Sequence, residues 1–98
     1  MTRGRKKLKK ELIATLPQNC FWVHNGPILS DLAELHEALK HEITLEQYEH
    51  HVTDEKNDFA DWIEGTLSDR ACANQVRNAK KQDTAVDRVK MCLKRYKQ

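Results

Sequence analysis

Adjacent histidines and a following run of acids form the part of this chain best suited to acid–base or metal chemistry. His50 and His51 are neighbours, and Asp58 closes the polar stretch 53–58. An imidazole titrates near neutral pH, it is a common metal ligand, and a nearby carboxylate can orient it. The residues His50, His51 and Asp58 are therefore a candidate acid–base or metal centre.

The spacing of the other histidines and of the cysteines argues against such a centre. His36 and His41 are five residues apart, which turns them about 140° away from each other on one helix. No histidine pair has the i,i+4 spacing of a helical zinc pair, and Cys20, Cys72 and Cys92 include no C-x-x-C. A glycine-rich phosphate loop and a nucleophile elbow are also missing. We therefore expect no metal, no cofactor and no catalysis.

The polar stretch also has a structural interpretation, as the start of a helix. Phe59, Trp62 and Ile63 follow at helical spacing and are expected in the core. Thr53 or Asp54 is expected to cap this helix, and the acids in its first turn complement the helix dipole.

Asn57 needs a further explanation, because asparagine has a poor propensity for the interior of a helix. We expect Asn57 or Asp58 to hydrogen-bond the backbone of a neighbouring loop, for example the 24–27 turn.

Charge is strongly segregated along the chain. The formal net charge is +2, but residues 1–10 carry six bases and no acids, and residues 11–69 carry thirteen acids against two lysines. Residues 70–98 carry nine bases and two acids. Basic ends can neutralise phosphates of nucleic acid, or they can neutralise the acidic middle of the same or a neighbouring chain. The candidate nucleic-acid contacts are Arg3, Arg5, Lys6, Lys7, Lys9, Lys10, Lys94 and Arg95.

The elements that position these residues are expected to be mainly helical. An apolar stripe of Leu8, Leu12, Ile13 and Leu16 predicts a helix that ends before Pro17. Residues 20–29, with Asn-Gly-Pro turn chemistry, predict a small hairpin or extended arm. Further helices are expected to begin near Ser30, Thr44, Thr53 or Asp54, Ser68-Asp69, and Asp83 or Thr84.

Length and composition indicate one small domain. The chain has 98 residues, of which 39% are hydrophobic and 33% charged. We expect a basic amphipathic arm over 1–17 and a single helical domain over 18–98. The expected fold is mainly α, a bundle of four to five helices with a short N-terminal β-hairpin or extended arm. No apolar run could span a bilayer and no secretion signal opens the chain, so the expected location is the cytoplasm.

Three spaced motifs lie within about residues 20–80: an F-W-V-x-x-G-P opening, an L-x-E-L-x-x-A-L helix and an N-D-F-A-x-W-I core. Together they resemble an uncharacterised family of small bacterial and archaeal domains. The chain departs from the family pattern where Ala71-Cys72-Ala73 replaces a Leu-Ala pair. The resemblance implies a fold and no assigned activity. The motif residues are Gly26, His51, Asn57, Asp58, Phe59, Trp62 and Ile63.

These observations favour a small, non-catalytic protein-interaction module that binds a protein partner or a second copy of itself. The alternative is a nucleic-acid-associated accessory protein that uses its basic ends. An enzyme or metal protein centred on His50, His51 and Asp58 is the least favoured hypothesis.

Overall fold

The structure is a computed structural model that describes residues 11–96 of the chain. These residues form five α-helices and a two-stranded hairpin, which confirms the expected fold class. In chain order the elements are the 3-10 helix η1 (Pro17–Asn19), β2 (Phe21–Trp22), β3 (Ile28–Leu29), α1 (Leu32–His41), α2 (Leu45–His51), α3 (Asp58–Gly65), α4 (Arg70–Arg77) and α5 (Gln82–Leu93).

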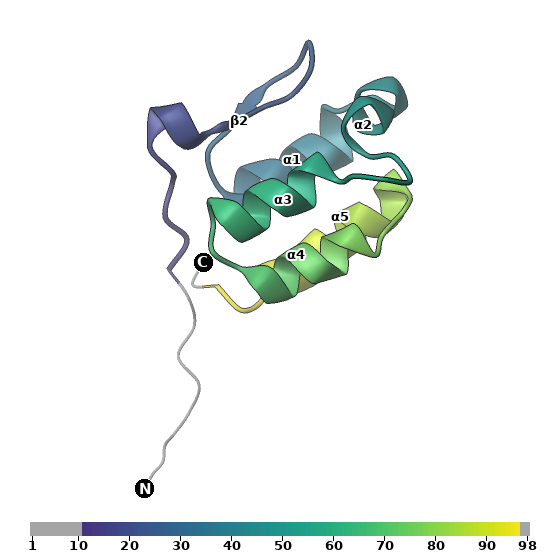
Figure 1. Cartoon of the computed structure of the whole chain (residues 1–98). Helices are drawn as coiled ribbons and strands as arrows, with labels where there is room; N and C mark the ends of the chain where they lie inside the picture. Colours follow the sequence, from purple (N-terminus) through teal and green to yellow (C-terminus); the bar gives the residue numbers. More distant parts are fainter. Residues whose placement is uncertain (1–10, 97–98) are drawn as a thin grey trace, which may run out of the picture.

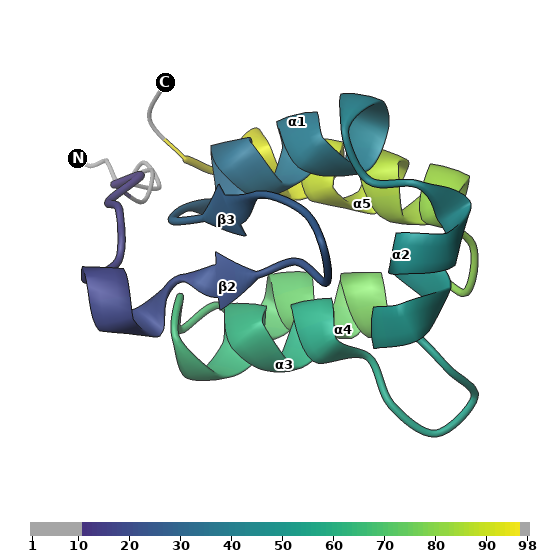
Figure 2. The same ribbon diagram turned by 90° about the horizontal axis from the view of Figure 1, so that it is seen from above.

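The helices are stacked in two layers, and the hairpin covers one of them (Figure 1). Helix α1 packs on α5, α3 packs on α4, and α4 and α5 lie side by side. Seen from above, the hairpin lies over the space between α1 and α3, while α2 closes one end (Figure 2). The hairpin is antiparallel, with Phe21 opposite Leu29 and Trp22 opposite Ile28.

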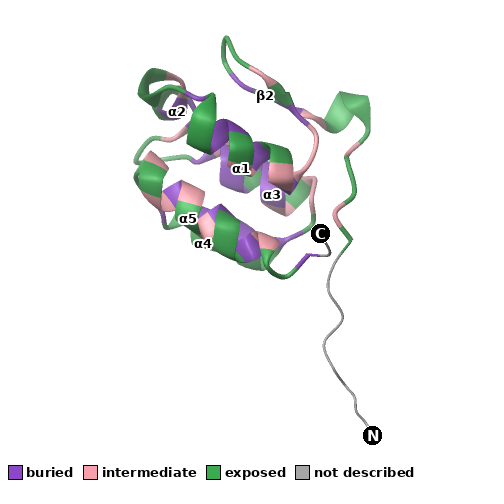
Figure 3. Ribbon diagram, turned by 180° about the vertical axis from the view of Figure 1, so that it is seen from behind, coloured by how far each residue is buried: buried purple, intermediate pink, exposed green. Residues whose placement is uncertain are grey.

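The core lies where the hairpin and the helices face one another (Figure 3). Phe59 and Ile63 are fully buried and Trp62 is 8% exposed, so the predicted inward face of the motif helix is confirmed. Phe21 reaches this face from the hairpin, and its ring stacks on Phe59 with centroids 4.8 Å apart. The Trp62 indole donates a hydrogen bond to the Asn19 carbonyl at 2.8 Å. The motif helix therefore joins the hairpin and η1 to the helical layers.

The starts of α1 and α3 differ from the expectation by one to a few residues. Asp31, and not Ser30, caps α1, because its carboxylate accepts from the Glu34 N–H at 2.8 Å. Helix α3 begins at Asp58 with Asn57 as its N-cap, so Thr53 and Asp54 do not cap it. The physical reason is that residues 53–56 form a turn, closed by a hydrogen bond from the Thr53 N–H to the Lys56 carbonyl at 2.9 Å.

Of the remaining helix starts, those of α2 and α4 agree with the sequence and that of α5 does not. Thr44 opens α2 with the predicted capping box to Gln47, and Asp69 caps α4 as expected. Helix α5 begins at Gln82, ahead of the predicted Asp83 or Thr84. The Gln82 side chain donates to the carbonyls of Leu39 and Ile43, which ties this helix start to the end of α1.

The prediction of a helix ending before Pro17 is wrong for its described part. Residues 11–16 have no regular secondary structure, and Ile13 and Leu16 are 70% and 60% exposed. The Thr15 N–H instead donates to the Ser30 carbonyl at 2.8 Å, which holds this segment beside the end of β3. Pro17 occupies the first turn of η1, where a missing N–H costs nothing. The rest of the predicted helix, including Leu8, lies outside the described residues.

Candidate functional site

Asn57 joins the start of α3 to the end of α4. Its side-chain oxygen accepts from the Ala60 N–H at 3.0 Å, and its amide nitrogen donates to the Val76 carbonyl at 3.3 Å. The side chain is buried, at 5% exposure. A hydrogen bond from Asn57 to neighbouring backbone was expected, but the suggested partner, the 24–27 turn, is wrong. Asn57 reaches α4 because it immediately precedes α3, and α3 packs on α4.

His51 is the residue that holds the 24–27 turn. Its Nε2 accepts from the His24 backbone N–H at 3.0 Å, and its Nδ1 lies 3.0 Å from the Asp58 carboxylate. Because a backbone N–H can only donate, Nε2 must be the unprotonated nitrogen. The ring proton is therefore on Nδ1, which donates a hydrogen bond to the Asp58 carboxylate. Both ring nitrogens of this buried histidine are thus occupied within the fold.

The Asp58 carboxylate is ionised and accepts hydrogen bonds from His51 and Lys56. The Lys56 ammonium lies 3.0 Å from the same oxygen that His51 contacts. Partial burial by itself raises the pKa of Asp58, but the hydrogen bonds from His51 and Lys56 more than reverse this effect and leave the pKa below its usual value. The Asp58 carboxylate is therefore ionised at neutral pH and orients the His51 ring.

The remaining histidines of this region lie on the surface beside the turn. The His24 and His50 rings stack with centroids 3.9 Å apart and planes 9° from parallel. Desolvation, followed by the nearby His24 and His51, lowers the pKa of His50. Among residues 11–96, no group of three or more histidine, cysteine or acidic side chains could hold a metal ion.

Gly26 allows the turn to pack closely on α2. A Cβ at this position would lie 2.8 Å from the Val23 side chain and 3.0 Å from the Gln47 amide nitrogen. That amide donates to the carbonyls of His24 and Asn25, at 3.0 and 2.9 Å. Asn25 itself has a φ of 54°, as expected for the first residue of the Asn-Gly pair. Two side chains of α2 consequently hold the hairpin turn: Gln47 donates to its carbonyls and His51 accepts from the His24 N–H.

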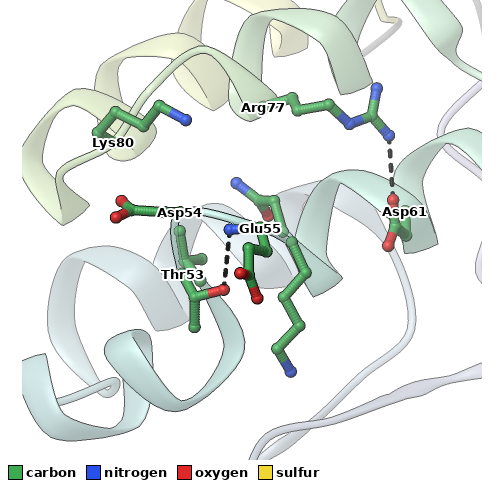
Figure 4. Close-up of a pocket in the computed structure, with 9 residues that line it drawn as sticks. Thr53, Asp54, Glu55, Asp61, Arg77 and Lys80 are labelled. Atoms are coloured by element: carbon green, nitrogen blue, oxygen red, sulfur yellow. Dashed lines mark hydrogen bonds and ion pairs between the residues drawn. The ribbon is translucent and has the colours of Figure 1, made fainter.

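A small pocket lies between the 53–57 loop and the end of α4 (Figure 4). It has a volume of about 250 Å³ and contains charges of both signs. Arg77 donates to Asp61 at 3.1 Å, and Lys80 extends on the side of the pocket that faces Asp54. Hydrogen bonds to Asp61 and Glu64 raise the pKa of Arg77. A pocket of mixed, mutually compensating charges has no net preference for an anion or a cation. It is lined by Val52, Thr53, Asp54, Glu55, Lys56, Asn57, Asp61, Arg77 and Lys80.

The outer face of the hairpin is apolar and open. Trp22 is 69% exposed and Ile28 is 50% exposed, although their neighbours Phe21 and Leu29 are buried. Trp22 and Ile28 are cross-strand partners, so their side chains lie next to each other on the same face. We call these two side chains the hairpin pair. The F-W-V motif was expected to mark the fold, but its period-2 alternation could have indicated that Trp22 faces outward.

The buried acid Asp69 was noticed in the sequence only as a helix cap. It is 1% exposed and accepts a hydrogen bond of 2.6 Å from the Tyr96 hydroxyl, which joins the segment after α5 to the start of α4. Burial and this contact with Asp69 raise the pKa of Tyr96. Contact with the Cys92 thiol and burial likewise raise the pKa of Cys72. Cys72 is therefore a protonated core thiol and lacks the thiolate character of a nucleophile.

The structure describes only two of the candidate nucleic-acid contacts. Lys94 is exposed, while the Arg95 guanidinium lies 3.6 Å from the Asp69 carboxylate and is partly used within the fold. The contacts predicted at Arg3, Arg5, Lys6, Lys7, Lys9 and Lys10 lie outside the described residues.

Comparison of the chain with protein-family models, with curated proteins and with solved structures found no match. Within residues 11–96, none of the helices has both the length and the apolar character required to cross a membrane.

Proposed function

We propose that this protein is a small, non-catalytic interaction module that binds a partner protein through the outer face of its hairpin. The observation that supports this proposal is the exposure of Trp22, which is 69% accessible beside Ile28. Exposed apolar patches on soluble domains often mark interaction sites, and tryptophan is enriched among the residues that dominate binding energy.

The hairpin is held in place before any partner arrives. Phe21 stacks on Phe59, His51 accepts from the His24 N–H, and Gln47 donates to two carbonyls of the turn. A surface that is already ordered loses little conformational entropy on binding. An isolated two-stranded hairpin would be unstable. Because contacts with α2 and α3 keep this hairpin ordered, its outer face is suited to binding.

The geometry around His51 gives little support to a catalytic role. A histidine base needs a free nitrogen within reach of the proton it removes. Both nitrogens of His51 have partners, the backbone N–H of His24 and the carboxylate of Asp58. These contacts instead serve to hold the hairpin against α2 and α3.

The test is a capture experiment with three versions of the purified full-length protein: the wild type, Trp22→Ser and Met91→Ser. Met91 is a matched control, because it is 64% exposed but lies on α5, away from the hairpin. We expect the wild type and Met91→Ser to retain the same partner in near-stoichiometric amount, and Trp22→Ser to lose it. Circular dichroism must show that all three are equally folded. Retention of the same partner by Trp22→Ser would refute the proposal.

A further inference from the structure

The hairpin pair borders an acidic groove between β3 and α1. Ile28 belongs to both surfaces, because it faces Trp22 across the hairpin and also lines the groove. The groove has a volume of about 360 Å³. Its lining residues are Pro27, Ile28, Leu29, Asp31, Ala33, Glu34, Glu37 and Glu42. An apolar anchor and a row of carboxylates therefore form one continuous surface.

The carboxylates of the groove are only partly compensated within the fold. Asp31 caps α1, and Glu34 accepts from the Ser30 N–H and hydroxyl. Glu37 has a long contact of 3.9 Å with His41, and Glu42 is exposed at the end of the helix. Residues 31–42 contain four acids and a single lysine. The groove thus keeps a negative potential that an incoming positive charge can satisfy.

We propose that the hairpin pair and this groove bind a segment of a partner polypeptide in which Lys or Arg residues flank apolar side chains. The apolar side chains contact Trp22 and Ile28, and the basic side chains lie beside Glu37 and Glu42. The exposed indole of Trp22 can in addition take a Lys or Arg cation over its face. This inference rests on the proposed function and adds the chemistry of the partner.

The probe is a synthetic peptide, GKRKLLKRKG, and its control is GQQQLLQQQG, in which every base is glutamine. Binding to the full-length protein is followed by tryptophan fluorescence, because Trp22 is exposed whereas Trp62 is buried. We expect the basic peptide to shift the emission to shorter wavelength and to bind more weakly as ionic strength rises. We expect the glutamine peptide to bind at least about tenfold more weakly, because it lacks the charge-assisted contacts.

Two double variants that change the net charge equally distinguish specific binding at the groove from nonspecific electrostatic attraction to the whole protein. Glu37→Gln with Glu42→Gln removes two groove carboxylates, and Glu46→Gln with Glu49→Gln removes two exposed carboxylates of α2. An exposed ion pair changes affinity by a factor of about 1.5 to 5, so the groove variant, which loses two such pairs, should bind about 2- to 25-fold more weakly. The α2 variant should stay within about twofold of the wild type.

The following outcomes would overturn the inference. Equal weakening of both double variants, or equal binding of the glutamine peptide, would exclude a specific role for the groove carboxylates. Sedimentation that shows self-association of the full-length protein, lost in the groove variant, would make a second copy the occupant. In the capture experiment, a partner lost by Trp22→Ser but kept by the groove variant would refute this inference alone and leave the proposed function intact.

Discussion

Replacement of Asn57 by alanine tests whether one side chain joins α3 to α4. The substitution removes the N-cap oxygen that accepts from the Ala60 N–H, and it removes the amide that donates to the Val76 carbonyl. Both contacts are buried, so water cannot readily replace the missing partners.

The expected loss follows from these two contacts. Loss of an asparagine N-cap costs about 1 kcal/mol. Loss of the amide donor removes a hydrogen bond and leaves the buried Val76 carbonyl without its partner, at a cost of about 1–2 kcal/mol. The sum is about 2–3 kcal/mol, which for a domain of this size lowers the melting temperature by about 10–20 °C.

Urea and thermal unfolding followed by far-UV circular dichroism measure this loss, provided that the urea m-value is unchanged. Asn57→Ser keeps an oxygen for the cap and should lose only about 1–2 kcal/mol. Asn74→Ala is the control, because Asn74 is an exposed α4 residue that contacts Arg77 on the same helix, and it should stay within about 0.5 kcal/mol of the wild type. An Asn57→Ala protein as stable as the Asn74→Ala protein would refute the reasoning.

Three further predictions concern Asp58, Tyr96 and Gly26. The folded pKa of Asp58 lies below its ordinary value of 3.8, so the stability that its ionised form contributes is present above about pH 4 and is lost as pH falls through the lower folded value. The stability difference between the wild type and Asp58→Asn, measured by urea unfolding, should therefore shrink in acid; a difference independent of pH would contradict this account. Tyr96→Phe removes a hydrogen bond to the buried carboxylate of Asp69 and should lower the free energy of unfolding by about 1.5–3 kcal/mol, and an unchanged urea midpoint would count against that contact. Gly26→Ala places a Cβ 2.8 Å from the Val23 side chain, so the melting temperature should fall by the equivalent of about 1–3 kcal/mol, and a fully stable variant would show that the turn can move away.

The core of the motif helix could be predicted from the sequence because it depends on local spacing. Phe59, Trp62 and Ile63 recur at helical intervals, and the structure buries all three. The capping box of Thr44 and Gln47 was also predictable, since both partners belong to one turn of the chain. The start of α3 could not be predicted in this way. Residues 53–56 form a turn, so Asn57 caps the helix and Thr53 and Asp54 do not.

The candidate site could be predicted only in part. His51 and Asp58 were named as part of a candidate acid–base or metal centre, and Asn57 as a residue that should hydrogen-bond neighbouring backbone. The backbone partners of His51 and Asn57 are far away in the sequence. His51 contacts the backbone of His24, and Asn57 contacts the Val76 carbonyl. The spacing of residues along the sequence cannot predict these contacts, because they depend on how the hairpin and α4 pack against α3.

The sequence by itself determined the mainly helical fold, the single core and the segregation of charge, because these follow from local spacing and composition. Tertiary structure alone decided what the polar residues do. It placed both ring nitrogens of His51 in hydrogen bonds, one with the His24 backbone N–H and one with the Asp58 carboxylate, so that His51 holds the hairpin turn. It also turned Trp22 outward beside Ile28, at the border of the acids of α1. Strand pairing sets which face a side chain occupies, and packing sets which face remains open.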